Sequence, residues 1–361
     1  MTKTIVQIVP RLPPYTDGVG DYALRLADRL LQEHEIFTHF LVFQQGIQTD
    51  PIIKGFSATG LPAHNTEAFL SVLPADIEGM ILHYSNYPYL LGKFDAPFWL
   101  VEALRSAMKL RQIKLVVMFH ELPKLKWQKI SFLNPIQSFV SRRLAQIASS
   151  VITDSGRFKA QLSQWTKSPI TCIPDFSTVG EPEHIPPLAQ RERKFIVFGG
   201  NDRHRVYKNA LPALLKTCQT WQITEIYDIG QPLNLNPAEF PGVHLNQMGF
   251  QPAELISKLM LDSWAGCFDY TRFPGDLGKS TVFAAYCAHG LIPLGTQYNP
   301  SEADGIEMNH NYLVLGDHLS QFNFEELQTI ANNAHQWYKS HNQTENAKVF
   351  ASHLLGEIHS S

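Results

Sequence analysis

Residues 4–43 read TIVQIVPRLPPYTDGVGDYALRLADRLLQEHEIFTHFLVF, and this stretch decides the fold. The apolar run TIVQIV (4–9) predicts a buried strand, DYALRLADRLLQ (21–32) an amphipathic helix, and THFLVF (38–43) a second strand. A strand, a helix and a strand in that order form a βαβ unit with two parallel strands. The segment therefore predicts an α/β fold with a parallel sheet.

The same rhythm continues along the chain in two series, separated by the polar, proline-rich stretch STVGEPEHIPPLAQRER. The strands predicted after the first βαβ unit are MILHY, KLVVMFH and SVITDS, and then KFIVFGG, EIYDIG, GVHLNQMGF, AGCFDY and GLIPLG. A closing helical segment is interrupted near residues 341–344. We predict two doubly wound, Rossmann-like domains that face a central cleft, because ligands of such sheets bind at the carboxyl ends of the strands. The predicted division is domain 1–178, linker 179–193, domain 194–340, and a C-terminal helix 341–361 packing back toward the first domain.

Length and composition limit the classes of protein to which this chain can belong. The chain has 361 residues, 44% hydrophobic and 17% charged, as expected for a globular protein with two domains. It has no run of about 18 apolar residues that would span a membrane, and its first residues lack the features of a signal peptide. The four cysteines lie far apart with no histidine at metal-ligand spacing, so we expect reduced thiols, no metal site and a cytoplasmic protein.

The net charge of −3 conceals a basic segment. Residues 105–143 contain nine lysines and arginines and one acidic residue, Glu121. Within it, LPKLKWQKISFL (122–133) mixes lysines with large apolar side chains, which suits docking at a membrane interface. Two interpretations stay open: a solvated helical face, or a surface that contacts an anionic membrane or a phosphate-bearing acceptor. Nucleic acid is not an expected partner, because the chain is acidic overall and shows no nucleic-acid module.

A glycine pair follows the first predicted strand. Gly18 and Gly20 let the backbone approach a ligand closely, and the helix that begins near Asp21 offers its N-terminal amides. A simple strand-to-helix turn is the alternative interpretation.

The letters GKST in GDLGKST (275–281) suggest a phosphate-binding P-loop. That loop needs a glycine five residues before Gly278, and the position holds Phe273. We therefore expect a helix N-terminus, where the amides of Lys279, Ser280 and Thr281 contact phosphate. An ordinary helix start with surface charges is the alternative.

Basic side chains follow the predicted strand KFIVFGG. In NDRHRVYKN (201–209), Arg203, Arg205 and Lys208 gather at the carboxyl end of that strand. Cationic side chains beside helix amides make a diphosphate seat.

A histidine also follows a strand in the first half. His120 comes directly after KLVVMF, at an end of the strand that points toward a ligand in α/β folds, where it can bond a hydroxyl or polarise a leaving group. A lone structural histidine is the competing interpretation.

The order of these motifs resembles that of the retaining GT-B glycosyltransferases of family 4. The resemblance covers nearly the whole chain and rests on the following segments: PPYTDGVGDYALRLADRL, FHELP, VITDSGRFKAQL, CIPDFSTVG, VFGGNDRHRVYKN, MGFQPAELISKLMLDSWAGCF and LGKSTVFAAYCAHGLIPLG. It implies transfer of a sugar from a nucleotide-diphosphate sugar to a glycan, lipid-linked or small-molecule hydroxyl acceptor, with retention and without a metal or other cofactor. Cell-surface polysaccharide assembly in bacteria is the implied setting.

The resemblance also implies roles for single residues. Gly18 would approach the donor phosphate or sugar and His120 would bond the donor sugar. Lys208 and either Arg203 or Arg205 would neutralise the diphosphate. The remaining donor-binding positions implied are Gly200, Asp276, Gly278, Lys279, Ser280 and Thr281.

This sequence departs from the family pattern at three places. The glycine pair of the N-terminal loop is reduced to Asp17-Gly18, the clamp arginine is displaced in register, and two glutamates are missing. The paired glutamates of the family, eight residues apart, align with Leu277 and Ala285, and Asp276 lies one residue from the first. Two hypotheses therefore stay open: an active glycosyltransferase, and a GT-B-shaped binding protein that has lost turnover and supports a partner enzyme.

Overall fold

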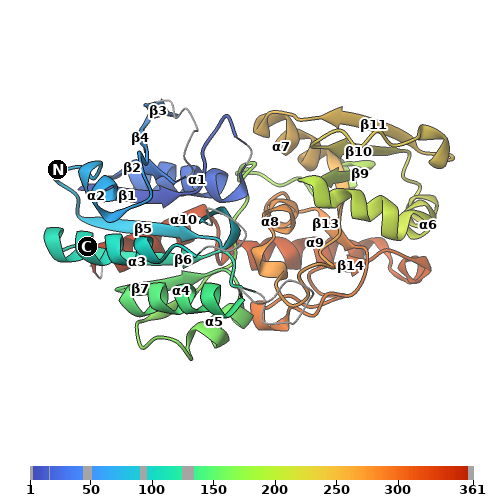
Figure 1. Cartoon of the computed structure of the whole chain (residues 1–361). Coiled ribbons are helices and arrows are strands. Elements are labelled where there is room, and N and C mark those ends of the chain that lie inside the picture. Colours follow the sequence, from blue (N-terminus) through green and yellow to red (C-terminus); the bar gives the residue numbers. More distant parts are fainter. Residues whose placement is uncertain (1–2, 16, 44–50, 90–95, 124–133, 357–361) are drawn as a thin grey trace. The chain divides into compact units, whose positions relative to one another are not determined.

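The computed structural model describes residues 3–15, 17–43, 51–89, 96–123 and 134–356. Within them the chain forms two compact units, the first comprising Met1–Ile173 with Gln343–Ser361 and the second Pro174–Asn342. Each unit is a sheet of mainly parallel strands with helices against it (Figure 1). The predicted α/β class with two Rossmann-like sheets is confirmed.

The first unit is built on an eight-stranded sheet of order β3-β4-β2-β1-β5-β6-β7-β8. Its pairs are parallel except β3 with β4, which is antiparallel. The strands are β1 (Lys3–Val9), β2 (Ile36–Val42), β3 (Ile52–Ile53), β4 (Phe56–Gly60), β5 (Gly79–Tyr84), β6 (Lys114–Phe119), β7 (Ser150–Thr153) and β8 (Ile170–Cys172). Its helices are α1 (Gly18–His34), α2 (Thr66–Ser71), α3 (Phe98–Arg111), α4 (Asn134–Ile147), α5 (Gly156–Leu162) and α10 (Gln343–Leu355).

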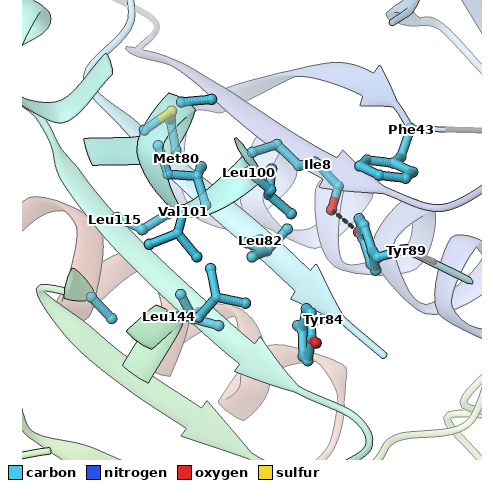
Figure 2. Packing of buried hydrophobic residues seen from close by; sticks show 14 of the residues in the cluster. Ile8, Phe43, Met80, Leu82, Tyr84, Tyr89, Leu100, Val101, Leu115 and Leu144 are labelled. Carbon is cyan, nitrogen blue, oxygen red and sulfur yellow. Dashed lines mark hydrogen bonds between the residues drawn. The ribbon is translucent and has the colours of Figure 1, made fainter. Parts of the chain in front are cut away.

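Two apolar cores cover the faces of this sheet. On one face, Ile8, Leu82 and Leu115 of the strands pack with Leu100 of α3 and other buried side chains, as Figure 2 shows. On the other face, residues of α1 pack against β2 and β4. The alternation of side chains along a strand explains this division, because Ile8 and its neighbours in sequence point to opposite faces.

The chain end returns to the first unit. The helical segment is interrupted as predicted, because α9 ends at Lys339 and α10 begins at Gln343. Tyr22 of α1 donates a hydrogen bond to Asn346 of α10 over 2.9 Å. Figure 1 shows α10, in red, among the blue and cyan elements of this unit.

The second unit has a six-stranded, all-parallel sheet of order β11-β10-β9-β12-β13-β14. Its strands are β9 (Glu192–Phe198), β10 (Glu225–Ile229), β11 (His244–Gly249), β12 (Ser263–Phe268), β13 (Ile292–Gly295) and β14 (Leu313–Val314). Its helices are α6 (His204–Trp221), α7 (Ala253–Asp262), α8 (Thr281–Ala288) and α9 (Phe324–Lys339).

Helix α6 contains a kink. The basic segment NDRHRVYKN is largely helical, because α6 starts at His204. A kink at Ala210, with φ −140° and ψ 16°, precedes Pro212. Proline lacks the amide hydrogen that would bond to the preceding turn, so the helix bends there and continues.

No helix in the described part of the chain is long and apolar enough to cross a bilayer. Of the basic segment 105–143, residues 124–133 lie outside the described residues, and most of the sequence LPKLKWQKISFL with them.

Candidate functional site

A pocket lies in the second unit where β9 and β12 end. From β9 the chain builds β10 and β11 on one side, and β12 and the remaining strands on the other. In open α/β sheets this reversal of strand order opens a crevice at the carboxyl ends, which is the usual ligand position. The pocket is lined by Phe198, Gly199, Gly200, Asp202, Arg203, Arg205, Phe268, Asp269, Tyr270, Arg272, Phe273, Ser280 and Val282.

Glycines form the turn that leaves β9. Gly199 has φ +131°, and a Cβ there would lie 2.9 Å from a methyl group of Val282. A Cβ on Gly200 would meet no atom within 4 Å. The turn therefore needs glycine at the first position for its conformation, whereas Gly200, expected to bind the donor, faces open space in the pocket.

Arg203 is committed to protein groups. Its side chain is 2% exposed, and its Nε and Nη2 donate to the two carboxylate oxygens of Asp228 over 3.0 and 2.8 Å. Nη1 donates to the carbonyl oxygens of Gly199 and Gly200, and Nη2 also donates to that of Gln231. The guanidinium thus links the end of β9 to β10 in the wall of the pocket.

Arg205 and Arg272 bring positive charge to the pocket instead. Nη1 of Arg272 lies 2.9 and 2.8 Å from the two carboxylate oxygens of Asp202. Nε of Arg205 donates to Oδ1 of the same carboxylate over 3.4 Å. Both arginine side chains keep solvent access, with exposed fractions of 32% and 49%. The pocket therefore has two accessible guanidinium groups converging on one anion.

Lys208 is exposed on α6 and does not line the pocket. It follows Arg205 by three residues, so the two side chains occupy neighbouring positions on one face of the helix. Asn209, the next residue, donates to Asp269 of the pocket over 3.0 Å. The first turns of α6 thus lie beside the pocket with Lys208 near its edge.

The GKST segment is a helix start, as predicted, and not a P-loop. Residues Leu277–Lys279 form a 3₁₀ turn, and Ser280 is the N-cap of α8, accepting from the amide of Phe283 over 3.1 Å. The amides of Lys279 and Ser280 donate within the turn. Only Ser280 of the donor-binding positions predicted in this segment lines the pocket.

Within the described chain, the amides of Thr281 and Val282 make no hydrogen bond, as expected for the first residues of a helix. Gly278 is buried, and its amide donates to Asp304. Asp276 is fully buried. The amides that could bind a ligand are therefore those of Thr281 and Val282, whereas the sequence predicted those of Lys279, Ser280 and Thr281.

Asp269 makes one wall of the pocket anionic. Burial opposes its charged form, but hydrogen bonds from Thr271, Thr296 and Asn209 outweigh burial and lower the pKa of this carboxyl. A carboxylate held in this way can accept hydrogen bonds from hydroxyl groups of a ligand.

His120 lies in the first unit, directly after β6, and is buried. Its Nε2 lies 3.1 Å from Nδ1 of His83, and its Nδ1 lies 3.6 Å from Asp154. His83 in turn contacts Gln7, which donates to Thr38 over 3.0 Å. Burial, together with the neighbouring His120, lowers the pKa of His83 well below its usual value.

The N-terminal glycines differ in their surroundings. A Cβ on Gly20 would lie 2.3 Å from the carbonyl oxygen of Arg11, whereas Gly18 has open space around it. Asp17 caps α1 and accepts from the amides of Val19 and Gly20. Gly20 is required by the packing of the chain itself, and Gly18 is the glycine that a ligand could approach.

Sequence reasoning missed Asp202 and Arg272. Arg272 follows the predicted strand AGCFDY by two residues, so its position at a strand end was a usable signal. Its partner Asp202 lies 70 residues earlier in the sequence, and no spacing rule joins the two.

No protein-family model matches the chain, and no curated protein matches its sequence. Solved structures match over nearly its whole length. HepE of Anabaena in complex with UDP and glucose has a TM-score of 0.61 at 12% identity, covering 97% of this chain and 98% of that one. WaaG, described as a glycosyltransferase involved in lipopolysaccharide biosynthesis, has a TM-score of 0.55 at 13% identity, covering 98% and 100%.

A putative UDP-N-acetylglucosamine 2-epimerase from Listeria monocytogenes is also similar, with a TM-score of 0.61 at 13% identity, covering 98% of this chain and 96% of that one. These likenesses establish the GT-B fold. A shared fold does not determine the activity, which depends on the residues of the site.

Proposed function

We propose that the chain is a glycosyltransferase that moves a sugar from a nucleotide-diphosphate sugar to a hydroxyl acceptor. The observation that carries the proposal is the pocket at the ends of β9 and β12, with an open glycine turn at Gly200 and two accessible arginines. Diphosphate binding needs close backbone approach and guanidinium or ammonium groups, and both are present. The match with HepE, crystallised with UDP and glucose, supports a nucleotide-sugar ligand.

The chemistry we propose needs stabilisation of a leaving diphosphate. As the acceptor oxygen bonds to the anomeric carbon and the bond to the diphosphate breaks, Arg205 and Lys208 neutralise the developing charge. A phosphate oxygen of the leaving group takes the proton of the acceptor hydroxyl on the same face, which gives retention without a protein base and without a metal. Arg203 holds the β9 turn in place while Arg205 binds, since its guanidinium is engaged with Asp228.

The roles expected of Gly18 and His120, toward the donor phosphate and the donor sugar, remain predictions of the resemblance. So do the acceptor class and a setting in bacterial polysaccharide assembly in the cytoplasm. Peripheral contact with an anionic membrane through residues 105–143 is tested by sedimentation with acidic liposomes, which high salt should weaken.

A GT-B-fold binding protein without turnover is the second candidate. The two positions that align with the glutamates of the family hold Leu277 and Ala285, and both are fully buried. Neither position can offer a carboxylate to a sugar or a ribose. This observation favours a protein that binds a sugar nucleotide or glycan and supports a partner enzyme.

A thermal-shift panel with UDP, GDP, ADP and dTDP, followed by their sugar conjugates, tests the proposal. A ligand at about 100 times its dissociation constant adds about 2.7 kcal/mol of stability. Stabilisation by one nucleotide family directs a transfer assay whose products are analysed for transferred, free and epimerised sugar. Transfer supports the enzyme, and stabilisation without turnover supports a binding protein for sugar nucleotides. Stabilisation by none of these ligands contradicts the enzyme and favours a binding protein whose ligand is a glycan.

A further inference from the structure

Asp202 occupies the point where the two accessible arginines of the pocket converge. Nη1 of Arg272 contacts both of its carboxylate oxygens, and Nε of Arg205 contacts one. Asp202 belongs to the 3₁₀ turn Asn201–Arg203 that joins β9 to α6. The carboxylate thus comes from the very turn that lines the pocket beside Gly200.

A carboxylate between guanidinium groups occupies a position suited to a phosphate. Both anions present two negatively charged oxygen atoms to guanidinium N–H groups, as Asp202 does here to Nη1 of Arg272. Arg272 reaches this position from the loop after β12, and its guanidinium carbon lies 5.6 Å from the ring centre of Phe273. The ring lies within cation–π distance of the guanidinium, and Asp202 neutralises its charge.

The bonds to Asp202 are easily exchanged. The side chains of Asp202 and Arg272 are 44% and 49% exposed, and exposed ion pairs contribute little to folding stability. By contrast, Arg203 and Asp228 are both 2% exposed and form a pair that an incoming ligand cannot open cheaply. The pocket therefore contains one arginine, Arg203, in a buried ion pair. Its other two arginines, Arg205 and Arg272, pair with an exposed carboxylate that a ligand can replace.

We propose that Asp202 is an internal occupant of an anion seat formed by Arg205 and Arg272, and that a phosphate group of the ligand displaces it. Arg272 then takes the anion-binding role that was expected of Arg203, whose guanidinium is bonded to Asp228. Asp202 lowers the affinity for the phosphate group because it competes for the same two arginines. The inference rests on the proposed function only for the identity of the anion as a diphosphate.

Inorganic pyrophosphate is the probe, titrated by calorimetry into the full chain at low salt. Asp202→Asn keeps the shape of the side chain and removes its charge, so we expect pyrophosphate to bind about fivefold more tightly. Arg272→Gln should weaken binding at least fivefold. In the double variant the gain from Asp202→Asn should largely vanish, because the competitor acts through Arg272.

Lys258→Ala is the matched control, since Lys258 is an exposed cation of α7 outside the pocket lining. It should leave pyrophosphate affinity within twofold of the wild type. Equal or weaker binding by Asp202→Asn overturns the proposal, as does an undiminished gain in the Arg272→Gln background.

The failure of this inference can be separated from failure of the proposed function. A wild-type chain stabilised by a nucleoside diphosphate, with pyrophosphate affinity unchanged in Asp202→Asn, overturns the seat and leaves the function standing. A chain that binds no nucleotide but binds pyrophosphate more tightly in Asp202→Asn supports the seat and contradicts the nucleotide-sugar proposal.

Discussion

His120 Nε2 lies 3.1 Å from Nδ1 of His83, and the two rings are nearly parallel with centroids 5.4 Å apart. With Gln7 oriented as in the structure, its Oε1 accepts from Nε2–H of His83 over 2.7 Å. Neutral His83 then offers a lone pair at Nδ1, so Nε2–H of His120 donates to it. The contact therefore assigns a proton to Nε2 of His120, while its Nδ1 faces the carboxylate of Asp154 at 3.6 Å.

Replacing His83 by leucine should lower the free energy of unfolding by roughly 2 kcal/mol, because Gln7 and His120 lose a buried hydrogen-bond partner. The double variant His83→Leu/Gln7→Leu removes one of the orphaned groups and should be less destabilised than the two single effects added. Urea unfolding measures all three variants. Strict additivity of the two changes would mean that this hydrogen-bonded chain is not coupled.

Arg203→Gln should mainly lower the stability of the fold, whereas Arg205→Gln should mainly weaken nucleotide binding. Removing one partner of the buried Arg203–Asp228 pair leaves a carboxylate without its counter-ion and should cost about 3–5 kcal/mol of stability. Arg205 is accessible, and its replacement should change stability by less than about 0.5 kcal/mol while weakening nucleotide binding. Thermal unfolding and nucleotide titration distinguish the two. A stable Arg203→Gln chain with lost binding would make Arg203 the clamp instead.

Under the proposed mechanism, Lys208→Ala should abolish sugar transfer and leave the fold intact, because it removes an exposed charge of α6 that would neutralise the leaving diphosphate. Lys216→Ala is the control, because Lys216 is exposed on the same helix two turns further on. Initial transfer rates and melting temperatures are compared for both variants. Wild-type rates for Lys208→Ala would rule out its assignment to the diphosphate.

Gly20→Ala should destabilise the first unit by about 1–3 kcal/mol, because the new Cβ would lie 2.3 Å from the carbonyl oxygen of Arg11. Gly18→Ala, at a position with open space, should stay within about 0.5 kcal/mol of the wild type. The pair separates a packing requirement from a ligand role. Equal stability of the two variants would show that the turn after β1 shifts to make room.

The fold could be predicted from sequence, because hydrophobic periodicity is a local property. TIVQIV, KFIVFGG and AGCFDY are strands, and the helical stretches between them have the lengths that parallel connections need. Of the residues predicted for the site, those that line the pocket lie in the segment after β9, as Gly200 and Arg205 do, or at the start of α8, as Ser280 does. The partner of Arg203 lies 25 residues away on β10, and nothing in the spacing distinguishes Asp228 from other acidic residues.

The contact between His83 and His120 could not be predicted from the sequence either. His83 lies inside MILHY, a strand whose residues are all buried, so its side chain had to find a polar partner. Which partner it finds depends on strand register, since β5 and β6 pair with Tyr84 opposite Phe119 and thereby bring His83 near His120. Register follows from the whole sheet and cannot be obtained from one segment.

The stability of the second unit should decrease in mild acid through His289. Its Nδ1–H donates to the carbonyl oxygen of Ala285 and its Nε2 accepts from Ser257, each over 2.7 Å. Burial, with smaller effects from the charges of Arg191 and His335, lowers the pKa of His289 to about 4. The unfolded chain, with a pKa near 6.5, takes up the proton first, so the folded state is favoured fully above pH 6.5.

Between pH 6.5 and 4 this group should cost the folded chain up to about 3 kcal/mol, with no further loss below the folded pKa. His289→Gln is expected to be less stable at pH 7, because it loses the fitted bonds to Ser257 and Ala285, yet to lose less stability between the two pH values. Urea unfolding at closely spaced pH values gives the pH dependence of the free energy of unfolding for the wild type and for His289→Gln. Parallel slopes would assign the acid sensitivity to other buried histidines, of which His341, with a pKa lowered by burial to about 3, is the first to examine.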